Sequence, residues 1–369
     1  MKTGVVWLMV CWAFSVCAAV SGPIVFSGLS DASAAVALDA QRFVVADDEH
    51  NTLGVYRIDS PSASVGQIDL TAFLSIDDKH SEADIEGAAR VGDRIYWIAS
   101  HGRNKDGKER PNRYAFFATD IVYSGSGEDR TATLKPVGQP YRRLAYDLMG
   151  NPALQSLKLS ETIVPDRLLS KKELKSLAPK ESGLNIEGLA AGPEGSVLIG
   201  LRNPVYRDPA SQKDMAVVLV LKNPEAIVTA GQAAQFGSPI LLDVEGLGIR
   251  SIEYITPASG AAFYVIAAGP ADGENKFAFY TWPGGDSPAK KLFVRLPEEF
   301  APEAIFQIPG TDRLWVLSDD GTLEKPVANA QECLSGELLK NGKCPNRFMA
   351  DPNHRTFRAI PLHWDAPAP

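Results

Sequence analysis

The segment Asp84-Ile-Glu86-Gly87-Ala-Ala, followed after a turn by Arg94-Ile-Tyr-Trp-Ile-Ala-Ser-His101, recurs 101 residues later as Asn185-Ile-Glu187-Gly188-Leu-Ala and Ser196-Val-Leu-Ile-Gly-Leu-Arg202. In both copies, the last residue of the second segment lies fifteen positions after the glutamate. Three looser copies keep this spacing: Glu253 with Ala268, Glu303 with Ser318, and Ala32 with Asp47. Five units in register indicate an internally repeated fold.

Each unit has the pattern of antiparallel strands. The segments are short, rich in β-branched and aromatic residues, and bounded by Gly, Asp, Asn and Pro. Successive origins are 54, 101, 66 and 50 residues apart, close to the roughly 40 to 50 residues of a four-stranded propeller blade. The sequence therefore predicts an all-β protein, a β-propeller with five recognisable blades that start near residues 31, 84, 185, 251 and 302.

The long interval before the third blade predicts a helical insertion around residues 140–180. Ser170 and Glu173 form a capping box that starts a helix there. A degenerate sixth blade is the alternative for this interval. Residues 356–364 have the pattern of a last strand, which we expect to pair with the chain near residues 24–26 and to close the ring without free sheet edges.

The N-terminus predicts export. Residues 1–21 combine an early Lys2, an apolar run and small residues, as in a cleaved signal peptide. A lipoprotein anchor at Cys17 is the alternative. Residues 22–369 would then form a single β-propeller domain, periplasmic or secreted and without a transmembrane segment, because the apolar run is shorter than the roughly 20 residues of a span.

Charge and cysteine usage narrow the choice of partners. A net charge of −8 argues against a nucleic-acid partner, because such binding depends on Lys and Arg neutralising phosphates. Cys333 and Cys344 are the cysteines outside the predicted signal peptide, and in an oxidising compartment we expect them to form a disulfide that closes a small surface loop. A pair of thiolates on a metal is the alternative.

The repeat places charged side chains at one face of the propeller. In a blade, the start of the innermost strand and the end of the second strand lie at the same face, near the channel. Carboxylates that converge there would repel one another unless a cation neutralises them, and Ca²⁺ prefers oxygen ligands. The predicted metal ligands are Glu86, Glu187, Asp47, Asp48, Glu303 and Asp319. The predicted ligand-binding residues are Asp84, Asn185, Asn203, Arg250 and Glu253.

A structural role is the alternative for these acidic residues. A carboxylate at the start of a strand can accept hydrogen bonds from backbone N–H groups of the neighbouring blade, and a following glycine can allow a tight turn. The structural role is favoured for Glu253 and Glu303, where Tyr254 and Ala304 replace the glycine.

Catalytic chemistry at this face would involve three residues. His101 is the candidate general base, and Arg103 and Arg202 are the candidate groups for an anionic substrate. A solvated loop histidine is the alternative for His101. The sequence contains no HExxH, G-x-S-x-G, P-loop or dinucleotide motif, which disfavours a zinc protease, a serine-triad hydrolase and a nucleotide enzyme.

These motifs resemble a bacterial domain-of-unknown-function family, number 3616. The resemblance rests on the two Ile-Glu-Gly units with their following strands and on Gly248-Ile-Arg-Ser-Ile252, and it extends from about Ile24 to Trp364. More distantly, the Glu-Gly opening is similar to exported propellers with phytase-like or esterase-like activity, many of which use Ca²⁺. Ala32 and the altered copies at Glu253 and Glu303 depart from a full metal ring.

Three functions follow as hypotheses. The first is a calcium-dependent hydrolase of phosphoesters or esters at the channel mouth. The second is a non-catalytic propeller that binds an envelope carbohydrate, a peptide or a small molecule at the same face. The third is a lactonase-like metalloenzyme with a single ion deep in the channel.

Overall fold

The computed structural model describes residues 22–77, 79–125, 130–272 and 276–362. The predicted signal peptide lies outside these residues. Within the described ranges, no helix is both long enough and apolar enough to span a membrane.

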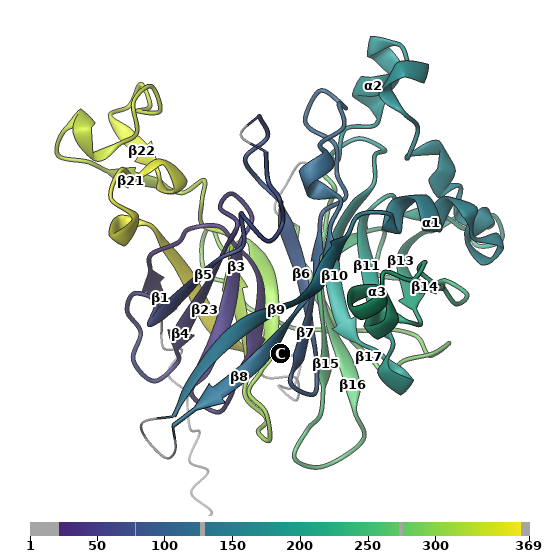
Figure 1. The fold of residues 1–369 in the computed structure, drawn as a ribbon, viewed down its shortest axis with the longest axis horizontal. Helices are drawn as coiled ribbons and strands as arrows, with labels where there is room; N and C mark the ends of the chain where they lie inside the picture. The colour runs from purple at the N-terminus through teal and green to yellow at the C-terminus, as the bar shows by residue number, and fades with distance from the viewer. Residues whose placement is uncertain (1–21, 78, 126–129, 273–275, 363–369) are drawn as a thin grey trace, which may run out of the picture.

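Five antiparallel sheets surround a common axis (Figure 1). The inner strands are β2 (Ala32–Ala37), β6 (Ile85–Val91), β10 (Asn185–Ala191), β15 (Gly248–Ile255) and β19 (Pro302–Gln307). The second strands are β3 (Arg42–Asp47), β7 (Arg94–Ala99), β11 (Val197–Asn203), β16 (Phe263–Gly269) and β20 (Leu314–Ser318). Each inner strand contacts the next, and β19 contacts β2, so the ring is closed. The prediction of a five-bladed propeller is confirmed.

Two further strands complete each sheet on the outside. The third strands are β4 (Thr52–Arg57), β8 (Phe116–Ser124), β13 (Asp214–Leu221), β17 (Ala278–Trp282) and β23 (Thr356–Leu362). The outermost strands are β5 (Gly66–Asp69), β9 (Thr131–Tyr141), β14 (Ile240–Leu242) with the short β12 (Tyr206–Arg207), β18 (Lys290–Leu292) and β1 (Ile24–Ser27). The helix α3 (Pro224–Ala230) joins β13 to β14.

The N-terminal strand closes the last blade. β1 pairs with β23, with Ile24 opposite Ala359 and Phe26 opposite Phe357, as expected from the sequence. Tying the two ends of the described chain into one sheet protects the edge of that blade.

The core fills the spaces between neighbouring blades. Strand β3 is buried at all six positions, as expected for a sheet covered on both faces. Between the last and first blades, the rings of Phe43 and Phe306 stack with centroids 4.9 Å apart, and Phe26 and Phe357 stack at 5.2 Å. This packing fixes the blades around the axis and therefore fixes the side chains at its mouth.

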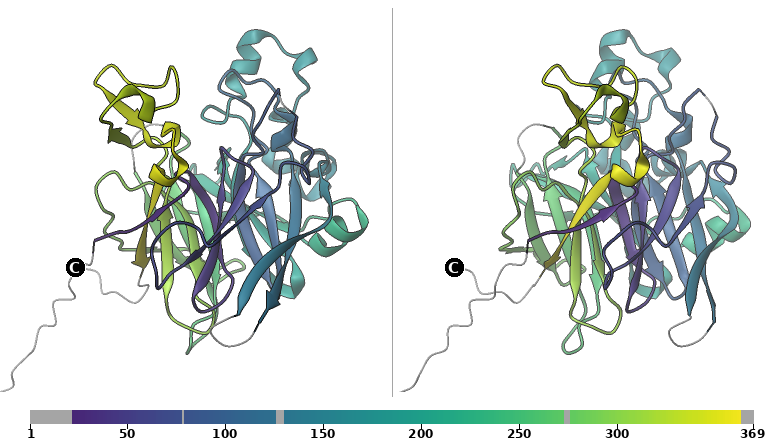
Figure 2. Two further views of the ribbon diagram at one scale, coloured as in Figure 1. Left: turned by 60° about the vertical axis from the view of Figure 1, so that its left-hand side comes forward. Right: turned by 90° about the vertical axis from the view of Figure 1, so that its left-hand side faces the viewer.

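Two insertions stand above the same end of the blades (Figure 2). The first joins β9 to β10 and contains α1 (Leu144–Gly150) and α2 (Lys171–Ser176), with the predicted Ser170–Glu173 capping box in place. The second joins β20 to β23 and contains β21 (Glu324–Pro326) and β22 (Lys343–Pro345). It holds the predicted disulfide between Cys333 and Cys344, but the sequence had indicated only a small loop there.

Candidate functional site

All five inner strands carry a β-bulge near the mouth. Pairing with the second strand shifts between Ala32 and Ala34, Ile85 and Gly87, Ile186 and Gly188, Ile249 and Ser251, and Pro302 and Ala304. A bulge can re-aim the side chain of the unpaired residue. The bulge residues, which we call the axial ring, are Ser33, Glu86, Glu187, Arg250 and Glu303.

The bulges correct the sequence register in two blades. The sequence had placed Ala32 and Glu253 at the positions equivalent to Glu86, whereas the structure places Ser33 and Arg250 there. Glu253 lies further along β15, and its Oε1 accepts a hydrogen bond from the backbone N–H of Gln307 in the next blade at 3.2 Å. This hydrogen bond is the structural role that the sequence analysis considered for Glu253, and Glu253 does not lie among the mouth residues.

The acidic members of the axial ring meet on the axis. Carboxylate oxygens of Glu86, Glu187 and Glu303 lie within 4.8 Å of one another. The Arg250 guanidinium contacts Glu187, with Nε 3.2 Å from Oε2, and also pairs with Glu303. Arg202 Nη1 lies 2.6 Å from Glu187 Oε1. Two of the three glutamates therefore have arginine partners.

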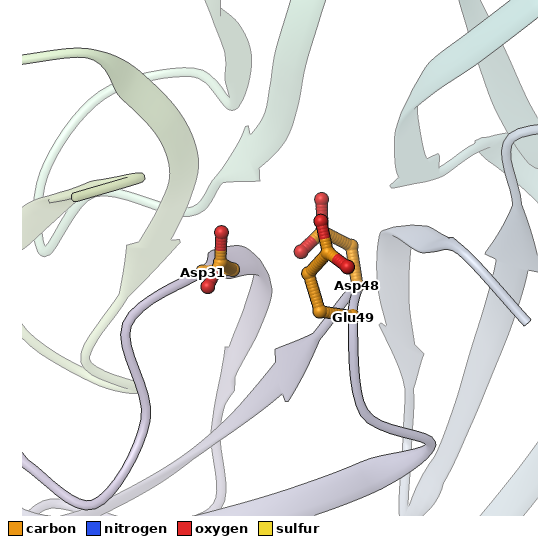
Figure 3. A group of neighbouring side chains, drawn as sticks. All are labelled: Asp31, Asp48 and Glu49. Carbon is orange, nitrogen blue, oxygen red and sulfur yellow. The ribbon is translucent and has the colours of Figure 1, made fainter. Parts of the chain in front are cut away.

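A second group of carboxylates lies above the ring and shares Glu86 with it. Oxygens of Asp48, Asp84 and Glu86, which we call the mouth cluster, lie within 4.8 Å of one another. Asp31, Asp48 and Glu49 form an overlapping group, in which Asp48 and Glu49 follow β3 and Asp31 precedes β2 (Figure 3). Asp48 thus connects the outer acidic residues with the axis.

Arginines neutralise only part of this charge. Arg113 Nη1 lies 3.0 Å from Asp84, and Arg347 pairs with Asp31 and Glu49. The three overlapping groups contain seven carboxylates, and four arginines contact them. If all seven ionise, the group and its four arginines carry a net charge of −3, and two of the carboxylates, Asp48 and Glu86, have no arginine contact among the described residues.

Burial makes this excess charge unfavourable. Burial, with neighbouring carboxylates, raises the pKa of Asp31 to about 7, and burial also raises the pKa of Asp84 to about 7. For Asp48 and Glu86, burial and then nearby carboxylates raise each pKa well above the usual range. A cluster in this state takes up either protons or a cation.

Within the described chain, Glu86 in the mouth cluster lacks the hydrogen-bond and ion-pair partners that a buried carboxylate usually has. Its side chain is more than nine-tenths buried, and no hydrogen bond or ion pair joins its carboxylate to another described residue, although the side chain also lines a cleft that is open to solvent. Asp48 is similar, because its Oδ1 is buried without a hydrogen-bond partner in the described chain. Buried carboxylates normally have partners, and these acidic side chains could hold a cation.

An open cleft of about 690 Å³ lies above the cluster. Glu49, Asp84, Glu86 and Glu187 contribute acidic groups to its lining. Basic residues from the loop after β7 and from the first insertion also line it: Lys105, Arg110, Lys175 and Lys180. Lys180 pairs with Asp272 at 3.3 Å, whereas no carboxylate of the described chain pairs with Lys105, Arg110 or Lys175. The cleft therefore combines buried carboxylates with positively charged side chains that have no carboxylate partner in the described chain.

The predicted catalytic residues are placed differently from expectation. His101 is buried, its Nδ1 lies 2.8 Å from the carbonyl oxygen of Ala99, and its ring packs edge-on against Tyr114. Burial lowers the pKa of His101 to about 4. The imidazole is absent from the cleft lining, so the geometry gives no support to a general-base role, and its burial contradicts the alternative of a solvated loop histidine.

The two predicted anion-binding arginines already have partners. Arg103 is buried and connects the loop after β7 to the first insertion through Asp166, the carbonyl of Val164 and the carbonyl of Gly107. Arg202 contacts Glu187 and the carbonyls of Pro270 and Ala271. Both arginines line the cleft, and the predicted role in substrate binding would have to compete with these contacts.

The remaining predicted residues divide between the site and its scaffold. Asp47 Oδ1 accepts hydrogen bonds from the backbone N–H groups of Glu49 and His50, at 3.1 and 3.0 Å. Asp319 accepts one from Gly321 at 2.9 Å. Neither belongs to the three-carboxylate groups within the described chain. Asp47 and Asp319 therefore shape turns beside the cluster.

The predicted asparagines both hold neighbouring groups in place. Asn185 Nδ2 donates to Glu187 Oε1 at 2.9 Å and lines the cleft. Asn203 Nδ2 donates to the carbonyls of Glu181 and Gly183, both at 2.9 Å, and so fixes the end of the first insertion.

The predicted site residues did not include Arg113, Arg347, Asp31 or Glu49. Arg113 lies in the loop between β7 and β8, and Arg347 lies in the disulfide-containing insertion. Neither has an equivalent in the other blades, so the repeat could not reveal them. Four of the six predicted metal ligands, Asp48, Glu86, Glu187 and Glu303, do come together.

These features define a class of protein, a five-bladed β-propeller with an acidic channel mouth beneath two insertions. Residues 31–314 match the family model described as protein of unknown function (DUF3616). The chain belongs to this family, as its motifs had indicated.

Solved structures are only distantly similar to this chain. No curated protein matches the sequence. Glutaminyl cyclase from Myxococcus xanthus is 12% identical, with 80% of this chain and 89% of that chain covered and a TM-score of 0.39. The GH43_1 enzyme from Xanthomonas citri is 11% identical, with coverage of 92% and 90% and a TM-score of 0.41. Trypanosoma rangeli sialidase is 8% identical, with coverage of 90% and 54% and a TM-score of 0.41. These neighbours are enzymes, but similarity this distant does not bear on the activity of this chain.

Proposed function

We propose that the protein is an exported, calcium-dependent hydrolase of phosphoesters or esters, with its cation in the mouth cluster. The observation that carries this proposal is the buried Glu86 carboxylate, which has no partner in the described chain and faces Asp48 and Asp84. Three carboxylates offer up to six oxygens, the ligand type and number that suit Ca²⁺, and water can supply the rest.

The basic side of the cleft supports an anionic substrate. Lys105, Arg110 and Lys175 line the cleft without carboxylate partners among the described residues, so they replace Arg103 and Arg202 as the candidate binding groups. A cation and these side chains together would neutralise the charge on a phosphoryl or carbonyl oxygen. In the reaction, a water oxygen bonds to phosphorus or to the acyl carbon, the ester bond to the alcohol oxygen breaks, and the proton released by water ends on the leaving alcohol.

The burial of His101 favours a second candidate function, a propeller that binds a ligand without chemistry. No imidazole of the described residues lines the cleft, so catalysis would have to rely on the cation and carboxylates alone. The same mouth would then hold an anionic carbohydrate or peptide through Lys105, Arg110 and Lys175.

The test begins with thermal unfolding of the mature protein in EDTA and in millimolar Ca²⁺. A ligand at a hundredfold excess over its Kd adds about 2.7 kcal/mol to the free energy of unfolding, which corresponds to a rise in Tm of roughly 5 °C. Glu86→Gln should reduce this rise to about half or less, since a tenfold loss of affinity leaves about 1.4 kcal/mol. Glu253→Gln, which changes a half-buried glutamate outside the site, should keep the rise.

Turnover then separates the two candidate functions. We expect Ca²⁺-dependent hydrolysis of an aryl phosphate or an aryl ester, lost in Glu86→Gln and weakened in KM by Lys105→Ala with Lys175→Ala. Calcium binding without turnover of phosphate, ester or lactone substrates would support the binding propeller instead. Absence of any Ca²⁺-dependent rise in Tm would overturn the cation site.

A further inference from the structure

The axial ring contains one positively charged side chain, that of Arg250. Four of the five bulge positions hold ionisable residues, three of them glutamates and the fourth Arg250 in the blade between Glu187 and Glu303. Because the bulge repeats in every blade, Arg250 reaches the axis from the same height as the glutamates. It is more than nine-tenths buried, like Glu187 and Glu303.

The contacts of Arg250 are those that a metal ion would otherwise make. Its guanidinium bridges two carboxylates of the ring, with Nε 3.2 Å from Glu187 Oε2 and an ion pair to Glu303. A cavity of about 10 Å³ lies between the blades and is lined by residues of all five inner strands. That cavity is too small for a hydrated ion, whereas on the solvent side Glu86 and Glu187 line the cleft of about 690 Å³ and Arg250 lines a second cleft of about 410 Å³.

Glu86 is the ring member without an arginine. It belongs both to the ring and to the mouth cluster, where Asp48 also has no positive partner in the described chain. The negative charge that remains after the arginines are counted therefore lies toward the mouth, on Glu86 and Asp48.

We propose that Arg250 is the built-in cation of the axial ring, so that the ring excludes metal and the protein keeps one exchangeable cation site, the mouth cluster. This inference rests on the proposed function and narrows it. It disfavours the lactonase-like hypothesis of an ion deep in the channel, because Arg250 occupies that position.

The decisive experiment measures Ca²⁺ stoichiometry by isothermal titration calorimetry on the mature protein. The wild-type protein should bind one ion, and Arg250→Met should bind two, because Glu187 and Glu303 lose their shared partner and can hold a second ion with Glu86. Arg250→Lys keeps a cation in place and should remain at one. Arg250→Met that folds and gains no additional Ca²⁺ would overturn the inference.

A second pair of variants tests the same idea without removing the arginine. Glu303→Gln should leave the affinity of the wild-type site unchanged, whereas Glu86→Gln should weaken it by at least about tenfold, since Ca²⁺ affinity follows the charge of the ligands. Loss of Ca²⁺ binding in Glu303→Gln would place the ion in the ring and refute the proposal. Circular dichroism is the control that tests whether each variant is folded.

These outcomes separate the inference from the proposed function. If the wild-type protein binds no Ca²⁺ but Arg250→Met binds one ion, the role of Arg250 is supported and the mouth site is wrong. If the wild-type protein binds one ion and hydrolyses nothing, the inference stands and the hydrolase proposal fails.

Discussion

Substitution of Gly87 by alanine should destabilise the propeller because the neighbouring inner strand is too close for a methyl group. A Cβ at this position would lie 2.9 Å from Ile98 Cγ2, 2.9 Å from Leu189 Cβ and 3.1 Å from the backbone nitrogen of Leu189. Optimal carbon separations are about 3.5 to 4.0 Å. Two of the three atoms belong to the backbone or to a Cβ, so they cannot move away by a simple change of rotamer.

The expected cost follows from overpacking in a buried layer. Such substitutions cost about 1 to 3 kcal/mol, and at about 2 °C per kcal/mol for a large domain, the Tm should fall by roughly 2 to 6 °C. Differential scanning fluorimetry in EDTA measures this change without a contribution from bound cation. The shift of β6 should also displace Glu86, so the rise in Tm on adding Ca²⁺ should become smaller.

Gly66→Ala provides the matched control. Gly66 also lies in a strand, but a Cβ there would have no heavy atom of the described structure within 4 Å, and its φ is not positive. Its Tm should change by less than about 2 °C, since removing backbone freedom alone stabilises by about 0.4 to 1 kcal/mol. If Gly87→Ala and Gly66→Ala have the same Tm, the close approach of the inner strands does not explain the glycine of the repeat.

Three further predictions concern groups outside the cation site. Burial raises the pKa of Glu253 to about 8 from its usual 4.5. The folded protein therefore loses stability as the pH rises from about 4.5 to 8, because the unfolded chain releases this proton first. When Tm is measured from pH 5 to pH 9, it should fall less in Glu253→Gln than in the wild-type protein. Replacing Cys333 and Cys344 with alanine together should cost about 2 to 3 kcal/mol by the chain-entropy model, visible in urea unfolding, and no loss of stability would mean that the insertion is held by other contacts. His101→Gln should lower Tm but leave KM and kcat for any substrate unchanged; a selective loss of kcat with normal Tm would restore the histidine to the catalytic site.

The repeat made the blade number and the mouth predictable from sequence. The spacing of fifteen residues from Glu86 to His101 and from Glu187 to Arg202 reflects a hairpin whose two ends lie at the same face. Pairing of β1 with β23 was predictable because an alternating strand at each end of the chain needs a partner. In these cases the local pattern and the global fold agree.

The residue that reaches the axis was predicted wrongly in blades whose sequence has diverged from the repeat, because the sequence does not reveal the position of the bulge. In the fourth blade, Glu253 suggested the expected acid, but the bulge lies at Arg250, and strand pairing rather than residue type decides which side chain reaches the axis. Gly87 was interpreted as a turn residue, whereas it lies inside β6 and is needed for the approach of β10. Arg113 and Arg347 come from loops whose path no short-range pattern specifies.

The bulge at one position of each blade explains how a repeated fold acquires a single asymmetric site. Fivefold repetition of glutamate would bury five like charges on the axis, at a cost that no propeller core could offset without a cation. Substitution by serine at position 33 and by arginine at position 250 removes this cost at two positions, and Arg202 shares the charge of Glu187. What remains is Glu86, next to Asp48 and Asp84 beneath the cleft. The charge left over by divergence of the repeat therefore lies beneath the open cleft, and this is why we propose the exchangeable cation site at the mouth.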